Sequence, residues 1–322
     1  MFMRSRSKTW LMILLIPAAY ALLLRLVFGI YVFHYLFSVM SIGFLVGLPF
    51  GMGYLAIRLS PLEWIKRPTY RILMSMAPIF VFLFITLQFS IEGWACWLMI
   101  LPVFLILAVM GGALAARHKL RRNEHKDAFK VSIVLLIPFF LSTAEHYAQF
   151  LPTRYEAYTY IDIHAAPSTI WNNVTAVKAI SPGEDHSSLT RWLGFPHPIR
   201  AELDYAGVGG SRQAIFSKGL IFKEVVKEYQ PEKKMHFSIA ADPHEIPSTT
   251  MDEHVVIGGD YFNVLDGTYE LEKLAEGSYR LHLYSHFILN THFNFYASWW
   301  AGLIMKDIQE NILQVIQTRC QG

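Results

Sequence analysis

Long apolar runs fill the first half of this 322-residue chain and constrain its fold more than any other feature. A helix that crosses the hydrocarbon core of a bilayer needs about 20 mostly apolar residues. The runs lie at residues 10–30, 35–57, 72–89, 94–116 and 131–147. The sequence therefore predicts an integral membrane protein whose N-terminal part, residues 1–151, is a bundle of about five spanning helices.

The last of these runs is the weakest. Its continuous apolar part, 131–141, contains Pro138, and Glu145 and His146 follow it. The run crosses the membrane only if these two polar residues lie at the far interface; the alternative is a short helix lying in the membrane surface. We expect a span, with Glu145 as an interfacial carboxylate beside His146.

The first two runs carry local signals of their own. Gly43, Gly47 and Gly51 follow one another at four-residue intervals, a spacing that predicts a small-residue face for close helix contact. The first run also allows a cleaved signal peptide ending at residues 19–21. We favour an uncleaved anchor, because the apolar run continues without a break through residues 22–24.

Basic residues alternate between the connections. Lys and Arg are frequent before the first run, between the second and third, and between the fourth and fifth, whereas residues 31–34 and 90–93 contain neither. Cytoplasmic connections carry an excess of Lys and Arg. We therefore expect a cytoplasmic N-terminus in the inner (cytoplasmic) membrane of a bacterium. Five spans then place residues 152–322 on the periplasmic or extracellular side.

Charge divides the chain at the same point. Residues 1–151 contain 14 Lys and Arg against 5 Asp and Glu, whereas residues 152–322 contain 14 against 20. An acidic soluble part argues against a nucleic-acid partner, because nucleic-acid binding depends on basic surfaces. The two cysteines, Cys96 and Cys320, offer no disulfide framework and no cysteine-based metal site.

The second part of the chain has the patterns of a soluble α+β domain. A short helix opens at Pro167, a long amphipathic helix is expected over residues 295–318, and residues 181–198 are expected to form a loop. Alternating apolar and polar residues predict the strands. These lie at residues 155–164, 202–208, 212–217, 220–229, 234–240, 269–274 and 279–289. Together they predict a curved antiparallel sheet wrapped around the long terminal helix.

This order resembles the helix-grip fold of the START-like (SRPBCC, or polyketide cyclase-like) superfamily. Four segments carry the resemblance: the strand-to-helix sequence at 163–171, the strand–turn–strand pair at 223–237, the strand at 266–271 and the terminal helix ending at 311–316. The resemblance extends over residues 155–320. It implies a cavity for a hydrophobic ligand, and it implies no common catalytic signature, because members include carriers, cyclases and aromatase-like enzymes.

The sequence offers candidates for the side chains that line such a cavity. We expect the loop at 181–200 to gate it and the terminal helix to close it. The expected lining residues are aromatic or partly polar. They are Trp171, Phe222, Tyr261, Tyr284, His286, Tyr296 and Trp300.

Histidines supply the candidates for chemistry. His282, Tyr284 and His286 alternate, so they share one face of a strand, but their spacing with His254 or His292 matches no metal-ligand motif. We therefore expect no metal and no cofactor.

Two acid–base pairs are catalytic candidates. One joins His254 to Asp252 or Glu253, and the other joins His286 to Asp266. Either would need a contact that the sequence alone does not establish.

Three functions follow from these patterns. The leading hypothesis is a membrane-anchored START-like domain that binds a hydrophobic small molecule or lipid. The alternatives are a cyclase-like or hydrolytic enzyme that uses histidines and carboxylates of the cavity, and a structural or regulatory membrane protein whose soluble domain binds another protein. The expected partners are the lipid bilayer and the apolar ligand, with a membrane protein in the third case.

Overall fold

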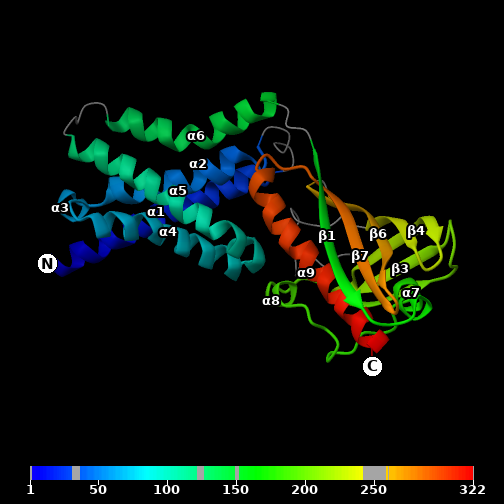
Figure 1. The fold of residues 1–322 in the computed structure, drawn as a ribbon. Coiled ribbons are helices and arrows are strands. Elements are labelled where there is room, and N and C mark those ends of the chain that lie inside the picture. Colours follow the sequence, from blue (N-terminus) through cyan, green and yellow to red (C-terminus); the bar gives the residue numbers. More distant parts are fainter. Residues whose placement is uncertain are drawn as a thin grey trace. The chain divides into compact units, whose positions relative to one another are not determined.

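The chain separates into two compact units, Met1–Phe150 and Leu151–Gly322, and each is described by itself. The boundary lies one residue before the one expected from the sequence. The computed structural model is shown in Figure 1. It describes residues 2–30, 37–121, 127–148, 152–241, 259 and 261–321.

The first unit is helical, and its five long helices are all long and apolar enough to cross a membrane. This confirms the expected spans by length and composition. The last of them continues through Pro138 instead of ending there. The helices are α1 (Phe2–Phe28), α2 (Ile42–Leu59), α4 (Pro68–Gln88), α5 (Trp94–Leu120) and α6 (Asp127–Ala148), with the short α3 (Leu62–Ile65) between α2 and α4.

Helix α2 is the most buried of the five, and its glycines explain why. A Cβ added to Gly53 would lie 1.9 Å from the carbonyl oxygen of Ala108 in α5. A Cβ on Gly43 would lie 2.5 Å from the carbonyl oxygen of Pro138 in α6, and one on Gly47 would lie 2.8 Å from the Pro138 ring. Small residues thus let α2 approach two neighbouring helices to backbone contact, as the glycine spacing predicts.

Glu145 lies near the end of α6, as expected, but it is buried. Its carboxylate accepts hydrogen bonds from the backbone N–H groups of Ile42 (2.9 Å) and Gly43 (3.2 Å). These are the first N–H groups of α2, which have no partner within the helix and lie at the positive end of its dipole. The carboxylate therefore fastens the end of α6 to the start of α2.

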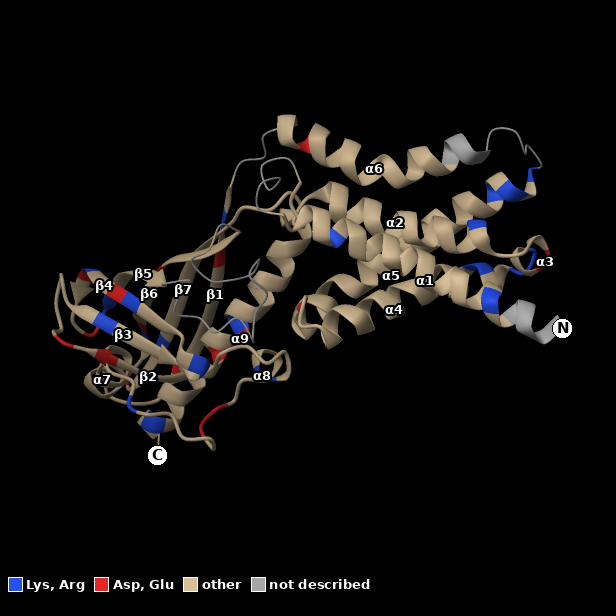
Figure 2. Cartoon of the chain, turned by 180° about the vertical axis from the view of Figure 1, so that it is seen from behind, with Lys and Arg blue, Asp and Glu red and all other residues tan. Residues whose placement is uncertain are grey.

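Lys and Arg residues gather at one end of the helical unit, the end that holds α3 (Figure 2). They come from the α2–α4 connection and the last turn of α5, among others. The other end holds Arg25, which forms an ion pair with Glu92 in the α4–α5 connection. Both side chains are largely buried. Arg25 is therefore neutralised by a carboxylate.

The second unit is a seven-stranded antiparallel sheet with the order β1-β7-β6-β5-β4-β3-β2 and a long terminal helix, α9 (Asn294–Gln321). Two short helices, α7 (Pro167–Thr175) and α8 (Leu189–Trp192), follow β1. This arrangement matches the helix-grip fold expected from the sequence. The strands are β1 (Thr153–Ile163), β2 (Pro198–Leu203), β3 (Ser211–Phe216), β4 (Ile221–Gln230), β5 (Lys234–Ala241), β6 (Phe262–Ala275) and β7 (Ser278–Leu289).

Helix α9 packs against one face of the sheet, here called the inner face. Leu281 and Leu283 of β7 lie in the same apolar cluster as Leu313 and Ile316 of α9. Side chains alternate between the two faces of a strand, so the residues between these leucines lie on the opposite, outer face.

A buried amide fixes the rotation of α9 on the inner face. The Gln309 side chain donates to Ser285 Oγ (2.9 Å) and to the carbonyl oxygen of Ala157 (3.1 Å), and it accepts from Thr159 Oγ1 (3.1 Å). Buried polar groups are costly unless they are hydrogen-bonded. This network therefore favours one orientation of the helix.

The alternating sequence pattern predicts the wrong bounds for one strand, β2. The sequence pattern extends it over 202–208, but β2 ends at Leu203 and a loop follows. Asp204 Oδ1 accepts a hydrogen bond from the backbone of Ser211 (2.7 Å), and Gly209 has a φ of +91°. A turn stabilised by a side-chain hydrogen bond and a left-handed glycine ends the strand in spite of its apolar residues.

Candidate functional site

A buried ion pair interrupts the apolar inner face of the sheet. Arg212 and Glu224 lie directly opposite each other on β3 and β4, and their side chains are only 4% and 5% exposed. The guanidinium donates a hydrogen bond from Nη1 to Glu224 Oε2. On the same face, β3 continues with Ala214 and Phe216, which are also buried. Charged groups at such positions are rare unless they are paired.

Aromatic side chains surround the pair. The Arg212 guanidinium lies 5.4 Å from the centre of the Phe237 ring, and the phenol of Tyr269 interacts with it. Burial opposes the charge on Arg212, but Glu224 and Tyr269 outweigh it and raise the pKa of the guanidinium. Burial also raises the pKa of Glu224, and Arg212 offsets only part of that effect.

One N–H donor of the Arg212 guanidinium has no acceptor among the described residues. Arg212 Nε is buried and has no hydrogen-bond partner in the part of the chain that the structure describes. A buried donor without a partner costs about 1–3 kcal/mol. The inner face therefore contains a buried N–H group that lacks an acceptor among the described residues.

The sequence contains a signal for this pair in the positions of its two charges. Arg212 lies two and four residues before Ala214 and Phe216, so it shares their face of β3. Glu224 likewise shares a face of β4 with Phe222 and Val226. Two opposite charges at buried positions of consecutive strands indicate a pair across the hairpin.

The expected cavity residues divide between the two faces. Trp171 of α7 lies in the main core, where its Nε1 donates to the hydroxyl of Tyr229 (3.1 Å), and Phe222 packs on the inner face against Phe216, with ring centres 5.1 Å apart. Tyr284 and His286 lie on the outer face, away from α9, because their neighbours on β7 point inward.

The remaining expected residues lie near the two ends of the β7–α9 connection. Tyr261 immediately precedes β6, and its backbone carbonyl accepts a hydrogen bond from Asn290 (2.9 Å). Tyr296 and Trp300 belong to the first turns of α9. Trp300 Nε1 is buried without a hydrogen-bond partner among the described residues. Contact of these side chains with a ligand remains a prediction.

The structure brings one expected acid–base pair together. His286 Nδ1 lies 2.6 Å from Asp266 Oδ1, and His286 Nε2 lies 3.3 Å from Glu156. This cluster is on the outer face. The other expected pair, His254 with Asp252 or Glu253, lies outside the described residues. Within the described ranges, no group of three or more His, Cys, Asp or Glu side chains is placed to hold a metal ion.

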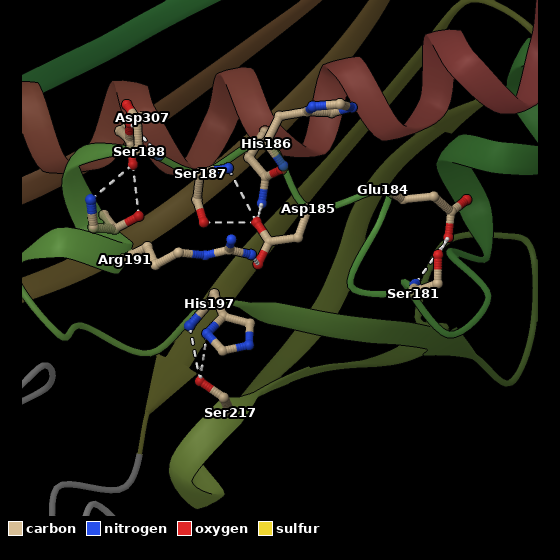
Figure 3. Close-up of polar contacts among 12 residues, drawn as sticks. Ser181, Glu184, Asp185, His186, Ser187, Ser188, Arg191, His197, Ser217 and Asp307 are labelled. Carbon is tan, nitrogen blue, oxygen red and sulfur yellow. Dashed lines mark hydrogen bonds and ion pairs between the residues drawn. The ribbon is translucent and has the colours of Figure 1, made fainter.

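The loop after α7 is fastened to α9 (Figure 3). Asp307 of α9 accepts hydrogen bonds from the backbone of Leu189 (3.1 Å) and Thr190 (2.9 Å) and from the hydroxyl of Ser188 (3.0 Å). Burial opposes the ionisation of Asp307, but these hydrogen bonds outweigh it and lower its pKa. One carboxylate thus holds the start of α8 against the terminal helix.

A second contact lies further along the same helix. Arg319 donates to Glu184 (2.7 Å) and to the backbone carbonyls of Lys178 and Ala179 (3.0 and 2.9 Å). Its ion pair is the main reason that the pKa of Glu184 falls to about 2. We call residues 178–192, which are held by Asp307, Asn311 and Arg319, the latch segment. The loop expected to gate the cavity is therefore attached to the helix expected to close it.

The latch segment is expected to loosen in acid. The folded pKa of Glu184 lies below its usual 4.5, so its contribution to stability is present above about pH 5 and is lost as the pH falls towards 2. We expect the melting temperature of the detergent-solubilised chain to fall over this range. Glu184→Gln should melt lower than the natural protein at pH 7 and should depend less on pH. Equal pH dependence in both proteins would contradict the assignment.

Comparison with known proteins adds a fold likeness only. No family model and no curated protein matches the chain. Solved structures that resemble it include norcoclaurine synthase from Thalictrum flavum (12% identity, 54% of this chain and 98% of that one, TM-score 0.34) and a START superfamily protein from Mycobacterium smegmatis (10%, 52% and 97%, TM-score 0.33). At such values the likeness carries no argument about activity. The elements themselves define a helix-grip domain joined to five membrane-type helices.

Proposed function

We propose that the second unit binds a hydrophobic small molecule or lipid between the inner face of the sheet and α9, and that the five apolar helices anchor it in a membrane. The observation that carries this proposal is the buried Arg212–Glu224 pair with its unpartnered Nε. An amphiphilic ligand satisfies both parts of such a face. Its apolar part would gain about 25 cal/mol per Å² of buried area, and its polar end would accept the free N–H.

A purely structural role accounts poorly for this pair. Replacing a buried ion pair by apolar residues of similar volume is often neutral or stabilising, because the desolvation of two charges offsets their attraction. Neighbouring positions of the same face carry apolar side chains such as Phe216, Phe222 and Val226. A buried ion pair at this position, with Arg212 Nε lacking an acceptor among the described residues, suits the binding of a carboxylate, phosphate or carbonyl group.

The latch segment supplies the route of entry in this proposal. Its polar contacts with α9 lie at Asp307, Asn311 and Arg319. Asn311 accepts a hydrogen bond from the backbone of His186 (2.8 Å) and donates one to Asp185 (3.1 Å), and Arg319 also holds two backbone carbonyls. Polar contacts of this kind break and reform without unpacking the apolar core. We therefore assign ligand entry to the release of residues 178–192 from α9, as the gating role expected from the sequence requires.

The membrane orientation follows from charge. The end of the helical unit that holds α3 carries most of its Lys and Arg residues (Figure 2). By the positive-inside rule this end faces the cytoplasm. Five spans then put the ligand-binding unit on the opposite side, which is the periplasm or the cell exterior if the membrane is the cytoplasmic membrane of a bacterium.

Photo-crosslinking tests the proposal. The probe is a fatty acid with a diazirine near the end of its chain, added to the full-length protein in detergent, with crosslinked peptides mapped by mass spectrometry. We expect crosslinks in β3, β4, β5 and α9. The double variant Arg212→Met/Glu224→Leu should keep the fold but lose about tenfold to a hundredfold in probe affinity, since a hydrogen bond to a charged group contributes about 1.5–3 kcal/mol.

The matched control is an ion pair of the same chemistry on the outer face. Asp162 and Arg280 are opposite each other on β1 and β7 and are joined by two hydrogen bonds (2.7 and 2.9 Å). Asp162→Leu/Arg280→Met should leave the crosslinking yield unchanged. The proposal fails if the probe labels only the membrane helices, or if the inner and outer double variants lose the same affinity.

A further inference from the structure

The first turns of α9 expose an apolar stripe. Phe295 is 82% exposed, Trp299 56% and Leu303 37%. They follow one another at four-residue intervals, so they lie on one side of the helix. Large aromatic side chains bury most of their surface in a soluble domain, whereas a patch that stays exposed marks a site of interaction.

The strand register places this stripe at the end of the domain where the chain comes from the helical unit. Thr153, the first residue of β1, pairs with Leu289, the last residue of β7. Helix α9 begins at Asn294, five positions after Leu289. The start of β1, the end of β7 and the start of α9 therefore lie together at one end of the sheet.

A short tether joins this end to an apolar helix. Thr153 follows Ala148, the last residue of α6, by five positions. The end of the domain that carries the aromatic stripe is thus the end that the chain enters five positions after a membrane-type helix ends.

We propose that Phe295, Trp299 and Leu303 form a membrane-docking surface that inserts into the interfacial layer of the bilayer. The rings of tryptophan and phenylalanine suit this layer, since aromatic residues concentrate where hydrocarbon meets headgroups. Insertion brings lipid to the first turns of α9. There the Trp299 ring contacts the rings of Tyr296 and Trp300. This surface concerns lipid contact and does not depend on whether the inner face binds a ligand.

Site-directed spin labelling tests the docking surface in the full chain. Cys96 and Cys320 are replaced by serine, and a nitroxide is attached to Phe295→Cys in nanodiscs of phosphatidylcholine and phosphatidylglycerol. Collision with oxygen is favoured in lipid, and collision with a nickel chelate is favoured in water. We expect the logarithm of the oxygen-to-nickel collision ratio to shift to positive values at position 295.

The control label lies at the other end of the same strands. Glu276, in the turn between β6 and β7, has a side chain that is 97% exposed and lies about 36 Å along β7 from Leu289. A label at Glu276→Cys should give a negative ratio. A negative ratio at position 295 would mean exposure to water, and shielding from both reagents would mean contact with protein, either the helical unit or a second copy. Each of these results overturns the proposal.

A second measurement needs no cysteine substitutions. In nanodiscs of brominated phosphatidylcholine, bromine quenches tryptophans that lie at the level of the lipid chains. We expect Trp299→Phe to remove part of the quenched emission of the natural protein. If bromine removes the same amount of tryptophan emission from the natural protein and from Trp299→Phe, Trp299 does not contact lipid and the docking surface is wrong. Neither readout uses the ligand, so failure here leaves the inner-face proposal standing.

Discussion

Glu224→Ala is expected to destabilise the second unit by about 3–5 kcal/mol, because it leaves the buried guanidinium of Arg212 without its counter-charge. The Phe237 ring and the Tyr269 phenol remain beside that charge, but neither carries a full negative charge. Urea unfolding of the detergent-solubilised chain, followed by the β-sheet signal in circular dichroism, measures the loss.

A second substitution separates the cost of the unpaired charge from the cost of a lost contact. Adding Arg212→Met to Glu224→Ala removes the orphaned charge and should restore most of the stability. A loss below about 1 kcal/mol for the single variant would mean that water or another group reaches Arg212. The same result for the single and double variants would mean that the ion pair is not the cause.

Gly53→Ala is expected to destabilise the helical unit by about 1–3 kcal/mol, the usual cost of overpacking. The added methyl carbon would lie 1.9 Å from the carbonyl oxygen of Ala108, so α2 and α5 must separate. Gly53→Leu should prevent the folded unit from forming. Thermal unfolding in detergent, followed by size-exclusion chromatography, measures both.

Gly302→Ala is the matched control for this substitution. Gly302 also lies inside a helix, α9, but an added Cβ meets no atom within 4 Å among its surroundings. Alanine is the better helix former by about 1 kcal/mol, so this variant should be as stable as the natural protein or more stable. If Gly53→Ala and Gly302→Ala lose the same stability, the close approach of α2 and α5 at Gly53 is not what the substitution disturbs.

The sequence predicted the elements well where one physical pattern dominates. Hydropathy alone located the five apolar helices, since lipid requires long uninterrupted runs. Alternation located six of the strands, and it showed that His282, Tyr284 and His286 share a face. It did not show which face α9 covers, because that depends on contacts between residues far apart in the chain. Tyr284 and His286 were therefore expected in a cavity but lie on the outer face.

Residues that act through distant partners were harder to predict. Glu145 is expected at the membrane interface because it ends an apolar run, but the sequence did not show that its carboxylate meets the start of α2, about a hundred residues earlier in the chain. Arg212 and Glu224 have charged side chains, and charge usually indicates a surface position. Their burial follows from the register of two neighbouring strands, which apolar patterning alone does not reveal.

Native mass spectrometry of the full-length protein, followed by extraction of bound small molecules, tests whether the inner face binds an amphiphilic ligand. We expect a stoichiometric amphiphilic ligand on the natural protein, and we expect that ligand to be lost from Arg212→Met/Glu224→Leu but not from Asp162→Leu/Arg280→Met. A natural protein that carries no ligand and takes up none of the lipids added to it would contradict ligand binding at the inner face.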